Sequence, residues 1–287
     1  MVKQTRLNPS ENGGSNPAPP LQLPELCLEF CSSGDSRYQE IRKQHYVPHK
    51  GSHGQQVHFL VWYKGKIAGI ITGGSPVYAC APRNTFFLMT KDNTKKIING
   101  IVDNTVFRLT NHEPNLGSRV LSLWEKATAK VWEDLYGVQV FGFETFIVRE
   151  GLLREEKING VLTYFTVDDP ENNVRRGNLY KAANWTHCGL SAGSTKGHDG
   201  VGLTGGREGG KGKFIRKSTP PKDVYCKWAK GHSEPVESEY KSSWKAATKE
   251  GTPEEKAIAK EKSTKRKGYL KTFFYRKGNQ IISENFQ

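Results

Sequence analysis

The sequence contains no apolar run that approaches the ~20 residues of a membrane-spanning helix, and no signal peptide opens it. It is also poor in cysteine, with five residues at irregular spacing: Cys27, Cys31, Cys80, Cys188 and Cys226. An odd, irregular set does not suit a disulfide framework. We therefore expect no membrane segment, reduced thiols and a cytoplasmic location. We expect Cys27 and Cys31, four apart, on a short apolar helix as core residues rather than as half of a zinc site.

Acidic residues are few relative to basic ones, with 29 Asp and Glu against 43 Lys and Arg, a net charge of +14 and a pI of about 9.5. Such a charge favours a polyanionic partner, because cations that neutralise phosphates release counterions. Residues 205–277 alone hold 20 Lys and Arg against 9 Asp and Glu. This distribution indicates a basic arm on a nearly neutral body, with DNA as the expected partner and tRNA as a second candidate. A basic protein without such a partner is the alternative.

Composition divides the chain into a leader, a body and an arm. Residues 1–24 are rich in Asn, Pro, Gly and Ser and are expected to be disordered. Residues 25–232 form the predicted domain, interrupted by a polar insertion at 149–177 and a glycine-rich loop at 193–212. Residues 233–287 are predicted to be a charged helical arm.

Hydrophobic periodicity predicts alternating strands and helices in the body. A hairpin is expected over residues 57–72, turning at Lys64-Gly65-Lys66. Apolar residues at three- and four-residue steps predict a helix over residues 115–136, closed by Gly137. Further strands are expected at 104–109, 138–148, 161–167, 186–190 and 221–228, and further helices at 25–44 and 178–185. This order indicates an α/β (α+β) fold.

Two segments resemble the acyl-CoA-binding centre of GCN5-related N-acetyltransferase-like (GNAT-like) folds. The first is a strand, a glycine-containing turn, the long amphipathic helix and a second strand. The second is the segment from Gly177 to Trp185 (GNLYKAANW), with Gly189 beyond it, which is similar to the helix whose tyrosine lies beside the departing thiol. The resemblance implies a GNAT-like central mixed sheet flanked by helices, and acetyl-CoA or another activated acyl donor.

A closer resemblance, over roughly residues 40–230 without the insertion, is to phage Mom-like adenine-modification proteins and to the related Druantia anti-phage component family. The stretch from Pro114 to Ser122 (PNLGSRVLS) is especially similar to the Druantia type. The other matching segments are His45-Tyr46, Gly65 to Gly69, Arg108, Asn115 to Trp124, Glu144-Thr145-Phe146 and Tyr180-Lys181-Ala182-Ala183.

This resemblance implies transfer of a small acyl- or carbamoylmethyl-type group to the exocyclic amine of adenine in phage DNA, an anti-restriction activity. A non-catalytic nucleic-acid-binding defence component is the alternative. A small-molecule or protein N-acetyltransferase is a third interpretation.

Three residues are the first candidates for catalysis. Tyr180 could protonate the leaving group, although a buried aromatic on a helix is common. Arg108 could hold a phosphate or carbonyl oxygen with its planar fork, or it could simply pair with Glu144 across the sheet. Glu144 could accept the proton of the adenine amine, directly or through water.

Three further catalytic candidates follow from the resemblance. Ser122 occupies a position where the Mom-like pattern also has serine, although such a serine often bonds only to backbone. His45 and Tyr46 are expected in the substrate site. A metal is a second interpretation of this region, because His45, His49, His53 and His58 are near one another in sequence.

The turn that should bind the donor departs from the usual pattern. GNAT-like folds usually present Gln/Arg-x-x-Gly-x-Gly/Ala, whose N–H groups bind the CoA phosphates at a helix N-terminus. Here Pro114 lacks an N–H, and Arg119 is bulky where a small residue is usual. We therefore expect weak acetyl-CoA binding and a donor such as an aminoacyl-tRNA. The predicted donor-binding residues are Asn115, Gly117, Ser118, Arg119 and Asn178.

Lysines and arginines alternate with aromatic residues near the C-terminus, which suits phosphate contacts combined with base stacking. A solvated helix with a small apolar face is the alternative. The residues predicted to bind nucleic acid are Lys211, Lys213, Arg216, Lys245, Lys265, Arg266, Lys267 and Lys271.

Overall fold

The computed structural model describes residues 23–45, 54–111, 113–148, 153–158, 161–166, 177–192, 221–238 and 251–285. Several predictions therefore lie outside the described residues. They concern nearly all of the leader, the 193–212 loop, Tyr46, His49, His53, Lys211, Lys213, Arg216 and Lys245.

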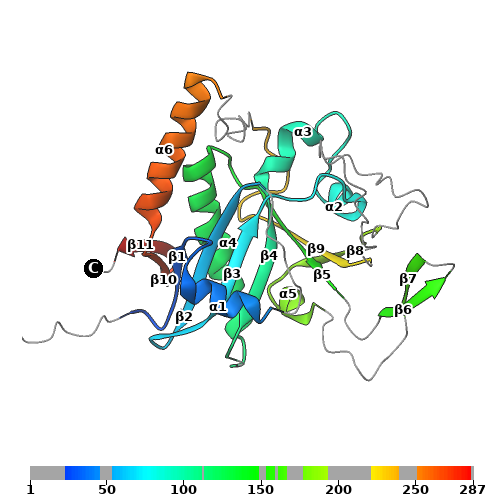
Figure 1. Cartoon of the computed structure of the whole chain (residues 1–287), viewed down its shortest axis with the longest axis horizontal. Helices are drawn as coiled ribbons and strands as arrows, with labels where there is room; N and C mark the ends of the chain where they lie inside the picture. Colours follow the sequence, from blue (N-terminus) through cyan, green and yellow to red (C-terminus); the bar gives the residue numbers. More distant parts are fainter. Residues whose placement is uncertain are drawn as a thin grey trace, which may run out of the picture.

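A nine-stranded sheet forms the centre of the structure, in the order β11-β10-β1-β2-β3-β4-β5-β9-β8 (Figure 1). Strands β4 and β5 are parallel, whereas the other paired neighbours are antiparallel. Its strands are β1 (Leu26–Cys31), β2 (Gln56–Tyr63), β3 (Lys66–Gly74), β4 (Ile101–Leu109), β5 (Gly142–Ile147), β8 (Thr186–Leu190), β9 (Asp223–Trp228), β10 (Thr272–Lys277) and β11 (Gln280–Asn285). A separate pair consists of β6 (Leu153–Ile158) and β7 (Val161–Thr166).

Helices flank the sheet on both faces. They are α1 (Ser36–Lys43), α2 (Ala81–Phe86), α3 (Thr94–Ile97), α4 (Leu116–Tyr136), α5 (Asn178–Ala182) and α6 (Pro253–Tyr269), with a 3-10 turn at Ile98–Gly100. Helix α1 lies over β2 and β3 on one face, and α4 crosses the opposite face (Figure 1). This architecture confirms the predicted mixed α/β sheet flanked by helices.

The predicted hairpin and long helix are both confirmed. The hairpin turn uses positive φ at Lys64 (49°) and Gly65 (74°), the backbone of a two-residue turn that matches strand twist. Helix α4 ends at Gly137, which has a φ of 64° and donates its N–H to the Glu133 carbonyl. The stripe that includes Val120, Leu123, Trp124, Ala127 and Val131 is buried against the sheet and builds the main core.

The prediction of a helix over residues 25–44 is wrong for its first half. Residues 26–31 form β1, which pairs with β2 on one side and β10 on the other. A central strand buried on both faces is nearly continuously apolar, and such a run is hard to distinguish from a short helix. Cys27 and Cys31 are therefore buried on a strand. The helix begins only at Ser36, where the Asp35 side chain caps it.

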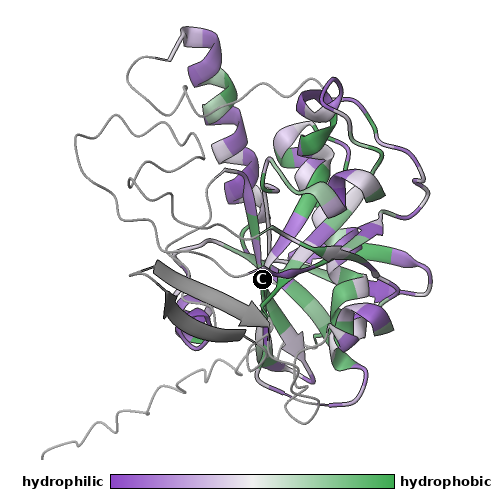
Figure 2. Cartoon of the chain, turned by 90° about the vertical axis from the view of Figure 1, so that its right-hand side faces the viewer, coloured by the Kyte–Doolittle hydropathy of each residue, from purple (hydrophilic) through white to green (hydrophobic). Residues whose placement is uncertain are grey.

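The prediction of a helical arm over residues 233–287 holds for α6 and is wrong for the segment that follows it. Residues 272–285 form the hairpin β10–β11, whose first strand pairs with β1 at the edge of the central sheet. Phe274 is fully buried there, in the same core as α4. Helix α6 itself has no buried residue and is largely hydrophilic along its length (Figure 2). Two further strands of the central sheet, β10 and β11, therefore follow β9 in the sequence.

Candidate active site

Strands β4 and β5 pair over three positions only and then diverge. Their register runs from Ile101 opposite Gly142 to Asp103 opposite Glu144, although both strands continue beyond it. The register of β4 with β3 shifts at the same level, so that Thr105 is the extra residue of a β-bulge. A bulge beside diverging parallel strands interrupts the regular ladder of the sheet, and polar side chains of both strands (Asp103, Asn104, Glu144 and Thr145) are buried at this level.

The last paired position carries two carboxylates. Asp103 and Glu144 are direct partners, and both are buried, with Glu144 fully so. One oxygen of each, Oδ1 of Asp103 and Oε1 of Glu144, is buried without a hydrogen-bond partner among the described residues. Such oxygens are costly to bury, and they are the atoms that could accept a proton or a substrate N–H.

Arg83 of α2 provides the counter-charge to this acidic pair. Its guanidinium is fully buried and donates from Nη1 to Glu144 Oε2 at 3.0 Å. Its Nη2 donates to the carbonyl oxygens of Val77 and Tyr78, at 2.8 and 3.1 Å. A single guanidinium thus ties Glu144 to the loop before α2.

Burial dominates the pKa values of both carboxylates, and the nearby cations (Arg83, and for Asp103 also Lys222) only partly oppose it. Burial raises the pKa of Glu144 to about 7, and the charge and hydrogen bond of Arg83 oppose the rise. Burial, and secondly the charge of Glu144, raise the pKa of Asp103 well above its usual range. The pair therefore shares protons near neutral pH, as two coupled sites do.

Tyr180 of α5 lies at the same level of β4 and β5, on the side of the sheet that α4 covers. Its hydroxyl donates to Asn104 Oδ1 at 2.7 Å, and Asn104 is adjacent to Asp103. Thr145, next to Glu144, donates to the Asn104 carbonyl oxygen at 3.1 Å and lies 3.5 Å from the Tyr180 hydroxyl. Each strand thus presents a carboxylate to one face and a neutral group contacting Tyr180 to the other. The predicted residues Tyr180 and Glu144 thus lie at the same level of β4 and β5 but on opposite faces of the sheet.

Arg108 does not pair with Glu144, which contradicts that interpretation. The two parallel strands have diverged at this position, and Glu144 is paired with Arg83 instead. Arg108 Nη2 donates to Gln44 Oε1 at 3.3 Å, next to the predicted substrate residue His45. Its Nε is buried without a partner in the described part of the chain. Arg108 and His45 are therefore brought near each other at the end of α1.

Ser122 is directed toward another part of the sheet. Its hydroxyl accepts a hydrogen bond of 3.1 Å from Arg276 of β10, a strand four places from β4 in the sheet order. His58 lies inside β2 and contacts Thr72 at 3.2 Å. Within the described residues no group of three or more His, Cys, Asp or Glu side chains could hold a metal ion.

The first turn of α4 contains no acidic residue, which suits an anionic group, but a side chain covers its backbone. Asn115 at its N-cap makes no capping hydrogen bond through its side chain, and the turn contains no acidic residue. Ser118 donates to the Asn115 carbonyl, and Arg119 is exposed. However, a Cβ added at Gly117 would lie 2.4 Å from the Leu179 side chain, which rests on this glycine. A phosphate could therefore meet Arg119 directly, but it could approach the Gly117 backbone only if Leu179 moved.

The profile of the Druantia protein DruA family matches residues 16–240. The chain belongs to this family. The predicted Druantia-type resemblance is thereby confirmed, whereas the Mom-like resemblance stays a prediction. None of the curated proteins compared with the chain matches it.

Two solved acetyltransferases are similar to the DruA-family chain. One is RimL, a ribosomal L7/L12 α-N-protein acetyltransferase in its apo form, with 9% identity and a TM-score of 0.35 over 71% of this chain and 94% of that one. The other is an acetyl transferase from Salmonella typhimurium that modifies the N-terminal serine of the 50S ribosomal subunit protein L7/L12. It has 9% identity and a TM-score of 0.28 over 61% of this chain and 64% of that one.

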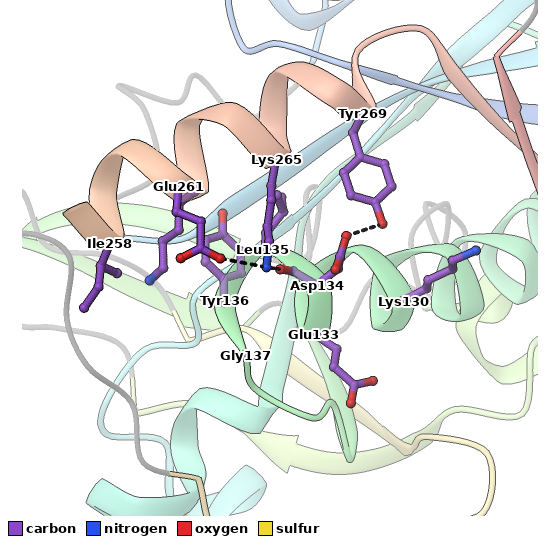
Figure 3. Close-up of a pocket in the computed structure, with 11 residues that line it drawn as sticks. Lys130, Glu133, Asp134, Leu135, Tyr136, Gly137, Ile258, Glu261, Lys265 and Tyr269 are labelled. Carbon is purple, nitrogen blue, oxygen red and sulfur yellow. Dashed lines mark hydrogen bonds and ion pairs between the residues drawn. The ribbon is translucent and has the colours of Figure 1, made fainter. Parts of the chain in front are cut away.

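In the DruA-family chain, two of the cations predicted to bind nucleic acid instead hold α6 in place. Arg266 Nη2 donates to the Gln56 carbonyl oxygen and to the Tyr136 hydroxyl, each at 2.6 Å. Lys265 donates to the Asp134 carbonyl oxygen and pairs with Glu261 (Figure 3). These contacts give Arg266, which is partly buried, a structural role in holding α6, whereas Lys265, Lys267 and Lys271 are exposed and stay predicted nucleic-acid contacts.

A pocket of about 650 Å³ lies between α6 and the C-terminal end of α4, in the region drawn in Figure 3. Its lining mixes charges of both signs, including Glu133, Asp134 and Lys262. None of the residues around Tyr180 or Glu144 lines it, so this pocket is separate from the candidate active site.

Sequence reasoning missed Asp103, Arg83, Asn104 and Thr145. The signal that could have found the first is an acidic residue inside an apolar run, since Asp103 follows Ile101 and Val102 directly. Arg83 lies on a short helix whose contact with Glu144 joins positions far apart in sequence, and no local pattern reveals it.

In the described parts of the chain, no helix combines the length and apolarity that crossing a bilayer requires.

Proposed function

We propose that this protein is a GNAT-like transferase that moves a small acyl-type group from an activated donor to the exocyclic amine of adenine in DNA. The observation that carries the proposal is the acidic pair Asp103–Glu144 at the last paired position of β4 and β5, with Tyr180 bonded to the adjacent Asn104 from the other face of the sheet. A proton acceptor and a proton donor at one level of the sheet suit a reaction in which an amine attacks and a leaving group departs.

The proposed step is an acyl transfer, in which one bond forms, one bond breaks and no oxidant or reductant is needed. The adenine nitrogen forms a bond to the acyl carbon, and the bond from that carbon to the donor's sulfur or oxygen breaks. The amine proton passes to the ionised member of the Asp103–Glu144 pair, whose raised pKa values suit a base working near neutral pH. Tyr180 donates its hydroxyl proton to the leaving group. A duplex substrate would need base flipping, because pairing occupies the amine.

The donor is proposed to be an acyl thioester such as acetyl-CoA or an acyl ester such as an aminoacyl-tRNA. When bound, it supplies the activated carbonyl. Arg119 and the first turn of α4 would hold its phosphates, and Asn178 at the start of α5 lies next to Leu179, which covers Gly117. That cover favours the nucleic-acid ester, whose bulk can be held elsewhere on the protein.

The deciding experiment is mass spectrometry of nucleosides from the DNA of cells that express the full chain. We expect a heavier deoxyadenosine with the wild type and none with Glu144→Gln. An unmodified adenine pool beside an altered cytosine would redirect the acceptor. Unmodified DNA throughout would favour the second candidate, a non-catalytic nucleic-acid-binding component. The complete burial of Glu144 supports that candidate.

A further inference from the structure

Cations gather along one side of α4, away from the acidic pair. Residues 119, 122, 126 and 130 follow one another at three- and four-residue steps, which places them along one face of a helix. Three of the four are basic. We call the following set the α4 basic stripe: Arg119, Lys126 and Lys130 of α4, Lys230 just after β9, and Arg276 of β10.

Hydrogen bonds fix the β10–β11 hairpin beside this face. Arg276 Nη2 donates to Ser122 Oγ at 3.1 Å, and Lys130 Nζ donates to Ser283 Oγ at 2.9 Å. Lys126 lies between these two contacts along the helix. Lys130 also lines the pocket between α4 and α6 that Figure 3 shows, so it lies at the end of the stripe nearest α6. The tertiary structure thus assembles the stripe from three separate segments.

The stripe cations are close enough to repel one another. Partial burial, then the charges of Arg276 and Lys230, lower the pKa of Lys126. Three positive groups from three elements therefore share one region, an arrangement that costs free energy in the free protein. A bound polyanion would offset that cost.

Glu133 continues this face of α4 beyond Lys130 and marks the end of the stripe, whereas two other nearby acids are engaged elsewhere or face the other way. In the β10–β11 register, Arg276 lies opposite Ile281, whereas Glu284 lies opposite Phe273, on the alternate face of the hairpin. Glu125, next to Lys126, is held by Lys227 at 2.8 Å. The shared face of the hairpin carries Thr272, Phe274, Arg276, Ile281, Ser283 and Asn285, with no acid among these described residues.

Arg119 at one end of the stripe is the nearest to an acid, at 3.5 Å from Glu25, and both side chains are about half exposed. An exposed pair of this kind is weak, so an anion can compete for Arg119. This end is also the first turn of α4, where the donor is proposed to bind.

Lys130 lies eleven residues beyond Arg119, about 16 Å along the helix. That length spans several phosphates of a nucleic-acid strand at roughly 3.4 Å of rise each.

We propose that the α4 basic stripe binds the phosphodiester backbone of a nucleic-acid strand whose end reaches the first turn of α4. This inference deepens the proposed function and rests on it for the identity of that end. Arg119, Lys126 and Arg276 contact successive phosphates, and Ser122 holds Arg276 in place. The stripe thus binds the nucleic-acid part of the donor. It does so in place of the first turn of α4, where Leu179 covers Gly117.

The test is fluorescence anisotropy of the full chain with two probes, a labelled deacylated tRNA and a labelled single-stranded DNA 20-mer, titrated at several salt concentrations. The stripe variant is Lys126→Gln/Lys130→Gln/Arg276→Gln. The control is Lys256→Gln/Lys260→Gln/Lys277→Gln, which removes equal charge from exposed positions on α6 and at the end of β10. Thermal melting checks that both variants are folded.

We expect the stripe variant to bind about tenfold or more weakly and to lose about 2 from the slope of log K against log[salt], at roughly 0.7 per single-strand phosphate contact. The control should lose less than about 0.7. A greater loss with tRNA supports the proposal that the stripe holds the donor, whereas a loss confined to the DNA probe overturns it in favour of the acceptor strand. Equal losses in stripe and control, or an unchanged stripe variant, overturn the proposal. Glu144→Gln should bind like the wild type, so failure of the transferase proposal leaves this result intact.

Discussion

Asp103 and Glu144 lie opposite each other at the last paired position of two parallel strands, and the buried guanidinium of Arg83 pairs with Glu144. Both carboxylates are buried where the pairing of β4 with β5 ends. Burial makes the charged form of either acid expensive, so the site holds a proton near neutral pH. The following predictions test this arrangement and the elements around it.

The acidic pair should make the protein less stable as pH rises. Glu144 has a pKa of about 7 in the folded chain against a usual 4.5, so between these values the folded state binds more protons than the unfolded state. The free energy of unfolding therefore falls as pH rises from about 4.5 to 7, by about 3 kcal/mol from Glu144, and the raised pKa of Asp103 acts in the same direction. Chemical denaturation across this range should show the fall in the wild type and not in Asp103→Asn/Glu144→Gln. Parallel curves for the two proteins would contradict the shared-proton site.

Replacing Tyr180 by Phe should separate chemistry from folding. The variant loses one hydroxyl that donates to Asn104, at a cost of about 1–3 kcal/mol for the acceptor left buried. Modification measured by nucleoside mass spectrometry should fall about 10²-fold or more, the scale of one general acid. Tyr136→Phe is the matched control, because it also loses a part-buried hydroxyl but lies at the far end of α4. Full activity in purified Tyr180→Phe would reassign this residue to the core.

Acetyl-CoA should bind weakly, with a dissociation constant of about 10⁻⁴ M or higher, a binding free energy of only ~5.5 kcal/mol. Pro114 offers no N–H, and Leu179 covers Gly117, so the turn presents few donors to a pyrophosphate. Calorimetry should show tighter acetyl-CoA binding in Leu179→Ala than in the wild type. Micromolar binding by the wild type, with no binding of charged tRNA, would restore an ordinary CoA mechanism.

Arg266 and Lys267 are neighbours in sequence that should behave differently. Arg266→Ala removes two hydrogen bonds that join α6 to β2 and α4, and should lower the free energy of unfolding by about 1–3 kcal/mol. Lys267→Ala changes an exposed side chain and should stay within about 0.5 kcal/mol. Urea denaturation measures both. Equal effects would mean that α6 is not docked through Arg266.

Deleting residues 233–287 should weaken DNA binding and flatten its salt dependence, but it would also unfold part of the sheet. The deletion removes β10, exposing the edge of β1 and the core around Phe274. A loss of binding in this truncated chain would therefore not separate charge from structure. The charge variants of the α4 basic stripe avoid this difficulty because they leave the sheet complete.

The sequence by itself determined the elements whose pattern is local. The hairpin at Lys64-Gly65 and the helix ended by Gly137 follow from turn residues and apolar spacing, and both are as predicted. It also identified Tyr180 and Glu144, because a resemblance of short segments is local information too. Only the tertiary structure decided what these residues meet. Arg83 lies 61 positions from Glu144, and β10 pairs with a strand near the other end of the chain, so neither contact leaves a periodic signal. Likewise, whether a lysine or arginine binds a partner or holds a helix, as Arg266 does, depends on which oxygens the fold brings within reach.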